Sequence, residues 1–129
     1  MTKKGTAKRV LLMEDESALS RIIGIKLGNA GFEVVTAMDG EAGLKLAGES
    51  DFDLVILDLM MPVVDGFSVL KSLRESGNRT PVLVTSNLSQ PADEARAREL
   101  GAQEFMIKSD VSLSEIVECV RRLTNGKTR

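Results

Sequence analysis

The groups best suited to chemistry in this sequence are three carboxylates, one hydroxyl and one ammonium, each at the end of a run of β-prone residues. Glu14 and Asp15 follow residues 8–13, Asp58 follows 54–57, Thr85 closes 81–85, and Lys108 follows 103–107. If these runs are parallel strands, their carboxyl ends meet at one edge of a sheet, where open α/β folds place their sites. We therefore expect the five side chains to converge.

Three carboxylates in a confined site repel one another, which raises a pKa unless a cation is present. A hard divalent cation such as Mg²⁺ removes that conflict, because it prefers oxygen ligands and keeps waters or phosphate oxygens in its shell. The sequence has no histidine and a single cysteine, Cys119, so zinc and other soft-metal sites have little support. A metal, an ammonium and a hydroxyl around a carboxylate suit phosphoryl transfer, with Asp58 as a nucleophile that becomes an acyl phosphate.

The segments between these runs have helical spacing of apolar residues, and a glycine stands at the end of each. The predicted strands cover 8–13, 32–37, 54–58, 81–85 and 103–107. The predicted helices cover 17–30, 40–48, 65–76, 90–100 and 113–125, with caps at Asp39, Ser89 and Ser112. Strict alternation of strand and helix predicts a parallel sheet with helices on both faces and right-handed crossovers.

The helical spacing also predicts which side chains face the core. The first helix is expected to bury a stripe that includes Ile22, and the second to bury Ala42, Leu46 and Ala47. Cys119 is expected to be a half-buried structural residue, because it lies at helical spacing between apolar positions.

Length and charge describe one globular domain with an acidic body. The chain has 129 residues and a formal charge of −2, but six of its 17 basic residues lie within 1–9 and 126–129. The other 11 basic residues stand against 19 acidic ones, a balance of −8, and there is no Trp or Tyr. Such a body is a poor nucleic-acid binder. No apolar run is long enough for a membrane span, and residues 1–7 have no apolar segment typical of a secretory signal, so a cytoplasmic protein is expected.

Four separated motifs together resemble the receiver domain of two-component response regulators, in particular the single-domain chemotaxis regulators. The motifs, in order, are residues 11–16, Leu-Leu-Met-Glu-Asp-Glu; 57–66, Leu-Asp-Leu-Met-Met-Pro-Val-Val-Asp-Gly; 84–86, Val-Thr-Ser; and 105–108, Phe-Met-Ile-Lys. The resemblance covers 8–125, leaving short tails at 1–7 and 126–129. It implies a flavodoxin-like, doubly wound α/β fold, a five-stranded parallel sheet of order 2-1-3-4-5 with five helices on both faces.

The resemblance also implies a role for each matching residue. Asp58 corresponds to the phosphoacceptor. Glu14 and Asp15, with Asp58 and the main-chain carbonyl of Met60, correspond to the Mg²⁺ ligands. Lys108 corresponds to the lysine that pairs with the phosphoryl group. Thr85 and Phe105 correspond to the switch hydroxyl and the switch aromatic, although Phe105 could equally be ordinary core.

The implied function is phosphorylation by a histidine kinase or phosphotransfer protein, followed by contact between a downstream protein and the fourth-helix, fifth-strand and fifth-helix face. Such a domain catalyses only its own phosphorylation and dephosphorylation. It is expected to be a monomer that could dimerise when phosphorylated. The family usually has proline after its lysine, whereas Ser109 follows Lys108 here, so a cis peptide is not expected.

Other functions compete with this one. The last predicted helix ends close to Arg129, which favours a stand-alone module, but the chain could also be a receiver from a longer regulator or hybrid kinase, or a pseudo-receiver that signals without phosphate. A small phosphatase needs a second nearby acid, and residues 59–64 contain none. A flavin binder needs a Gly-rich phosphate loop or stacking aromatics, and the sequence has neither.

Overall fold

The computed structural model describes residues 7–88 and 90–125 and has five strands and five α-helices in strict alternation. The strands are β1 (Arg9–Met13), β2 (Glu33–Ala37), β3 (Leu54–Asp58), β4 (Val82–Ser86) and β5 (Glu104–Ile107). The helices are α1 (Ser17–Asn29), α2 (Gly40–Glu49), α3 (Gly66–Glu75), α4 (Pro91–Glu99) and α5 (Leu113–Asn125). Every predicted element is present, with bounds that differ by at most one residue at either end. A short 3-10 helix, η1 (Lys108–Asp110), was not predicted.

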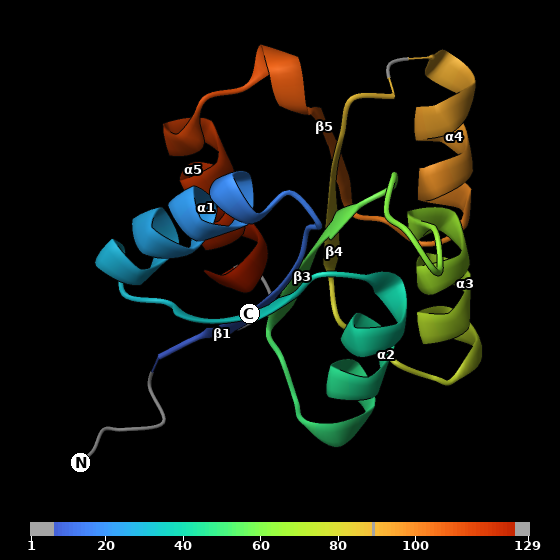
Figure 1. Cartoon of the computed structure of the whole chain (residues 1–129), viewed down its shortest axis with the longest axis horizontal. Coiled ribbons are helices and arrows are strands. Elements are labelled where there is room, and N and C mark those ends of the chain that lie inside the picture. The colour runs from blue at the N-terminus through green and yellow to red at the C-terminus, as the bar shows by residue number, and fades with distance from the viewer. Residues whose placement is uncertain (1–6, 89, 126–129) are drawn as a thin grey trace.

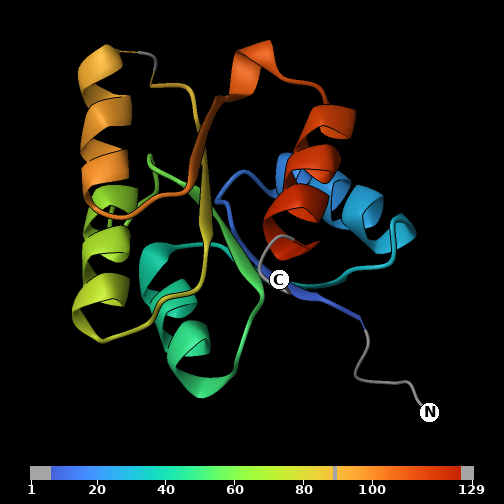
Figure 2. The ribbon, with the colours of Figure 1, turned by 180° about the vertical axis from the view of Figure 1, so that it is seen from behind.

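The sheet is parallel with the order β2-β1-β3-β4-β5, which confirms the predicted α/β topology. Helices α1 and α5 cover one face, and α2, α3 and α4 cover the other (Figures 1 and 2). In the part of the chain that is described, no helix has both the length and the apolar character needed to cross a bilayer. The predicted tails at 1–7 and 126–129 lie almost wholly outside the described residues.

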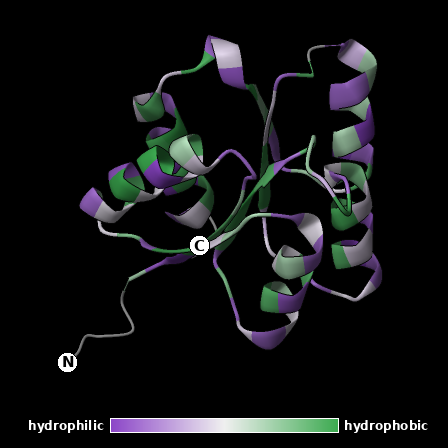
Figure 3. Ribbon diagram, viewed as in Figure 1, coloured by the Kyte–Doolittle hydropathy of each residue, from purple (hydrophilic) through white to green (hydrophobic). Residues whose placement is uncertain are grey.

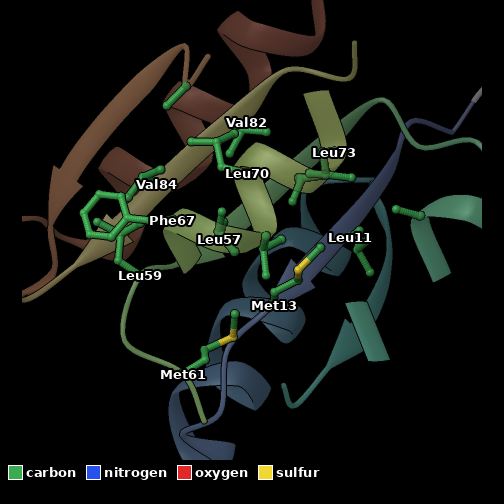
Figure 4. Packing of buried hydrophobic residues seen from close by; sticks show 14 of the residues in the cluster. Leu11, Met13, Leu57, Leu59, Met61, Phe67, Leu70, Leu73, Val82 and Val84 are labelled. Carbon is green, nitrogen blue, oxygen red and sulfur yellow. The ribbon is translucent and has the colours of Figure 1, made fainter. Parts of the chain in front are cut away.

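The middle strand β3 is buried along its whole length, because it has a strand on each side and helices on both faces. Its side chains alternate between two cores. Val55 and Leu57 join the cluster under α2, α3 and α4 (Figure 4), and Leu54 and Ile56 join the cluster under α1 and α5. This continuous apolar strand is what delivers Asp58 to the sheet edge.

Local signals fix the helix ends. The Asp39 carboxylate accepts the Ala42 backbone N–H at 2.8 Å, and the Ser112 and Glu115 side chains cap each other's backbone N–H groups at 3.1 and 2.7 Å. Both predicted caps are confirmed. The predicted cap at Ser89 and the helix end at Gly126 lie outside the described residues; Gln90 precedes α4.

Three burial predictions need correction. Ile22 is 48% exposed, because it lies on the side of α1 that faces solvent. Ala42 is also exposed, because α2 approaches the sheet through glycines: a Cβ on Gly43 would overlap the sulfur of Met13. Cys119 is fully buried rather than half-buried, and this burial raises the pKa of its thiol.

At the opposite end of the sheet from Asp58, the guanidinium of Arg74 joins two loops, one between α3 and β4 and the other between α4 and β5. It donates to the carbonyl oxygens of Asn78 and Thr80 at 2.9 Å, and to that of Gly101 at 2.8 Å. Burial, with the nearby charge of Arg79, lowers the pKa of Arg74. The charged side chain thus satisfies backbone acceptors where α3, β4 and β5 meet.

We expect Arg74→Met to lower the free energy of unfolding by about 2 kcal/mol, because the aliphatic stem stays while charge-assisted hydrogen bonds to carbonyl oxygens are lost. Urea unfolding measures the change. Arg79→Met is the matched control, since Arg79 is exposed, and it should change stability by less than about 0.5 kcal/mol. Equal losses in the two variants would contradict this account of Arg74.

Candidate functional site

Strand register brings the acidic and hydroxyl groups to one place. Asp58 pairs with Thr85 across β3 and β4, and Met13 pairs with Leu57, so that Glu14 comes level with Asp58. Side chains alternate along a strand, and Leu12, Ile56 and Leu83 lie in the core under α1 and α5. Glu14, Asp58 and Thr85, each two residues further on, therefore point to that same side at the carboxyl edge.

Lys108 completes the cluster from the end of β5. Its ammonium lies 2.7 Å from Glu14 Oε1 and 3.1 Å from Asp58 Oδ2. The other Asp58 oxygen, Oδ1, accepts the backbone N–H of Met60 at 3.0 Å. Asp58 is 3% exposed, so both of its oxygens are held by named donors inside a nearly closed site.

Glu14 is the most deeply buried acid of the group. It is 1% exposed, and burial raises the pKa of its carboxyl although the Lys108 ammonium and the Glu16 backbone N–H oppose the shift. Burial alone would lower the pKa of Lys108, but the hydrogen bond to Glu14 and the charge of Asp58 raise it overall. Oε1 of Glu14 lies 2.7 Å from the Lys108 ammonium, and apart from this ion pair it has no partner among the described residues.

This set of donors fits a hard divalent cation. Glu14, Asp15 and Asp58 each offer a carboxylate oxygen, and these oxygens lie within 4.8 Å of one another. Asp15 is exposed, whereas Glu14 and Asp58 are buried, so the group opens to solvent on one side only. Glu14 Oε1 is buried and has only the Lys108 ion pair among the described residues, so it keeps a lone pair that a metal ion could accept.

Met60 and Phe105 differ from the other residues singled out in the sequence, because their side chains lie outside the acidic cluster. Met60 projects its side chain to solvent, 56% exposed, and contributes its backbone N–H to Asp58. Phe105 pairs with Val84 and packs against the core under α2, α3 and α4, the opposite side of the sheet from Thr85. Its half-buried position agrees with either prediction, ordinary core or a movable aromatic.

Gly66 has a packing role that the sequence motif alone does not reveal. Its N–H donates to the Leu59 carbonyl at 2.9 Å, and a Cβ on Gly66 would overlap the Leu59 Cα. The start of α3 therefore presses directly on the chain leaving Asp58, an approach that only glycine permits. The available signal in the sequence was the Asp65-Gly66 dipeptide, which is typical of a tight turn. It does not indicate which residues the turn packs against.

Without Mg²⁺, Glu14→Gln should raise stability at neutral pH. A carboxyl whose pKa is higher in the folded protein than in the unfolded chain opposes folding once it ionises. For Glu14 the free energy of unfolding therefore falls above about pH 4.5 and continues to fall as pH rises through the folded pKa. Glutamine imitates the protonated form. We expect the melting temperatures of variant and wild type to agree near pH 4 and to diverge toward pH 7, with the variant higher. A variant that is less stable at pH 7 would contradict the assigned direction.

A five-stranded parallel sheet with an acidic group, a hydroxyl and a lysine at its carboxyl edge defines a class of signalling domain, and comparison with known families agrees. The chain belongs to the response regulator receiver domain family, whose model matches residues 10–121. It is thus a receiver domain of a two-component response regulator, a signalling domain and not an enzyme of the ordinary kind.

Particular relatives support this membership. The chain is 38% identical over 117 residues to the cell cycle response regulator CtrA of Brucella ovis, covering 88% of this chain and 50% of the relative. It is 36% identical over 122 residues to the probable transcriptional regulator ycf27 of Guillardia theta, covering 93% and 48%. The chain therefore spans about half the length of these curated relatives.

Solved structures resemble the fold over nearly their whole length. The receiver domain of the Francisella response regulator 1452 matches with a TM-score of 0.89 and 28% identity, covering 93% of this chain and 98% of that one. The Vibrio cholerae chemotaxis protein CheY4 matches with a TM-score of 0.84 and 28% identity, covering 92% and 99%.

Proposed function

We propose that this receiver domain accepts a phosphoryl group on Asp58 in a Mg²⁺-dependent reaction and signals through a change of its protein-binding surface. The observation that supports this most strongly is the contact of one ammonium with two buried carboxylates, Lys108 with Glu14 and Asp58, at the carboxyl edge of a parallel sheet. A structural ion pair needs one acid. Neutralising the Lys108 ammonium therefore does not explain why a second carboxylate is buried beside it.

The proposed nucleophile is a carboxylate oxygen of Asp58. Attack on the phosphorus of a phosphoryl donor forms an acyl phosphate, and the bond to the donor's leaving group breaks. The Met60 N–H holds Oδ1 at 3.0 Å, which orients the carboxylate. Lys108, 3.1 Å from Oδ2, is placed to pair with negative charge on the transferred phosphoryl oxygens.

Glu14 and Asp15, with Asp58 and the main-chain carbonyl of Met60, are the residues that would hold Mg²⁺. When bound, the ion neutralises charge on the phosphoryl oxygens and on the clustered acids. Glu14 is already aimed into the site, because its Oε1 contacts the Lys108 ammonium at 2.7 Å. Asp15 is exposed, so its carboxylate would bind the ion from the solvent side of the site.

Thr85 is proposed as the residue that senses the new charge. It is 1% exposed and pairs with Asp58 in the sheet, so a phosphoryl group on Asp58 comes next to its hydroxyl. Movement of Thr85 alters β4, whose neighbour Phe105 packs on the other side of the sheet. Such a local charge event coupled to repacking would change the α4, β5 and α5 face.

The surface near the site supports a protein phosphodonor, a histidine kinase or a phosphotransfer protein. An apolar pocket of about 240 Å³ lies between α1 and α5, and Thr85 and Lys108 form part of its wall. Ile22, which lines this pocket, is 48% exposed, and Met60, two residues beyond Asp58, is 56% exposed. Exposed large apolar side chains around a polar site are typical of a surface that a partner covers.

The proposal is tested by incubating the protein with acetyl phosphate and measuring its intact mass. We expect one added phosphoryl group with Mg²⁺ and none with EDTA. No added mass in either condition, together with no binding of beryllofluoride, would support the pseudo-receiver instead. An equal yield with and without Mg²⁺ would overturn the metal's assigned role.

A further inference from the structure

Helix α4 is attached to the domain by few apolar contacts. Ala97 is its one fully buried residue. Its ribbon has large hydrophilic stretches in Figure 3, whereas α3 buries Phe67, Val69, Leu70 and Leu73. A helix without an apolar stripe depends on individual side-chain contacts for its position, and these contacts can be identified.

Two arginines make those contacts. Arg98 connects α4 to β5: its guanidinium lies 3.6 Å from Glu104 and donates to the Gln103 carbonyl at 3.2 Å. Arg96 connects α4 to α3, because its guanidinium lies 4.1 Å from the centroid of the Phe67 ring. Phe67 is only 8% exposed, so Arg96 covers the outer face of a core aromatic ring with a favourable cation–π contact.

Phe67 connects this contact to the phosphorylation site. It is in the first turn of α3, directly after Gly66, whose backbone packs on Leu59 one residue beyond Asp58. The charge of Arg96 also contributes to lowering the pKa of Asp65, the N-cap of α3, after the larger effect of the Ser68 backbone hydrogen bond. A shift of the 59–65 loop would therefore move the ring on which Arg96 rests.

We propose that Arg96 is a latch that holds α4 on the Phe67 ring and sets how readily α4 leaves α3. The latch links the loop after Asp58 to α4 by a route that uses neither Thr85 nor Phe105. The existence of the latch is independent of phosphorylation. Its regulatory consequence, release of α4 when the site is occupied, rests on the proposed function.

Amide hydrogen exchange of unphosphorylated protein tests the latch. We expect Arg96→Gln to speed exchange of the α4 amides about two- to five-fold, the factor that matches the energy of one exposed cation–π contact. Arg96→Lys should restore part of the protection, because an ammonium also binds the ring face. Arg21→Gln on α1 removes the same charge elsewhere and should leave α4 unchanged.

A double-mutant cycle shows whether the ring is the partner. Phe67→Leu keeps an apolar side chain in the core but removes the π face. In that background Arg96→Gln should add no further acceleration. The same acceleration with and without the ring, or no acceleration in Arg96→Gln alone, would overturn the latch.

Binding of beryllofluoride with Mg²⁺ tests the coupling to the site. If occupancy of the site favours released α4, Arg96→Gln should bind beryllofluoride about two- to five-fold more tightly than wild type, by linkage. Equal affinity would overturn the regulatory half of the proposal. Failure of the wild type itself to bind would instead be a failure of the proposed function, and the exchange result would still decide the latch.

Discussion

Asp58→Asn should abolish phosphorylation, lowering the rate of phosphoryl incorporation at least about 100-fold. An amide oxygen is a far weaker nucleophile than a carboxylate, and the variant also removes one of the three acids that would hold Mg²⁺. The change keeps the size of the side chain and its acceptor for the Met60 N–H. Intact mass after incubation with Mg²⁺ and acetyl phosphate measures the loss.

Asp39→Asn is the matched control for that variant. Asp39 is also an aspartate at the carboxyl edge of the sheet, but its carboxylate caps α2, and asparagine caps a helix equally well. This control should incorporate one phosphoryl group at the wild-type rate. Full incorporation in Asp58→Asn would mean that another residue is the acceptor.

Lys108→Gln should give the second largest effect, a rate of phosphoryl transfer lower by about 100- to 1,000-fold, the usual cost of removing one preorganised charge donor. The Lys108 side chain is 15% exposed and its ammonium contacts both Glu14 and Asp58, so water cannot easily replace it. Glutamine keeps a hydrogen-bond donor of similar reach but carries no charge. The rate is followed by intact mass over time, at Mg²⁺ concentrations that saturate each protein.

Two measurements separate a chemical effect of that change from damage to the fold. Lys71→Gln removes a charge from an exposed pair with Glu75 at 3.6 Å and should leave the rate unchanged. The thermal unfolding of Lys108→Gln should remain cooperative. If the folded variant reacted as fast as wild type, Lys108 would be only a structural partner of the two acids.

The sheet and its site were predictable because their signals are local or follow from topology. An unbroken apolar run such as 54–57 predicts a buried parallel strand, and parallel strands bring their carboxyl ends to one edge. Thus Glu14, Asp58, Thr85 and Lys108, up to 94 positions apart in the chain, could be placed together from the sequence. The helix caps at Asp39 and Ser112 were likewise predictable from residue type.

The features that could not be predicted depend on how elements approach one another. Ala42 lies at the spacing of a helical apolar stripe. However, α2 packs through Gly40 and Gly43, and glycines carry no hydrophobic side chain that would indicate a buried side. Arg96 and Arg74 are ordinary charged residues in the sequence. Their roles over Phe67 and beneath the carbonyl oxygens of two loops follow only from tertiary packing.

The central claim, that Asp58 carries the phosphoryl group, is tested most directly by locating the modification. An acyl phosphate is reduced by borohydride, which converts a phosphorylated aspartate to homoserine, and peptide mass spectrometry then finds the altered residue. The structure predicts homoserine at position 58 and at no other aspartate, since Asp58 is held by both Lys108 and the Met60 N–H at the phosphoryl site. Conversion at Asp15 or Asp65, or phosphate that resists borohydride, would contradict the account.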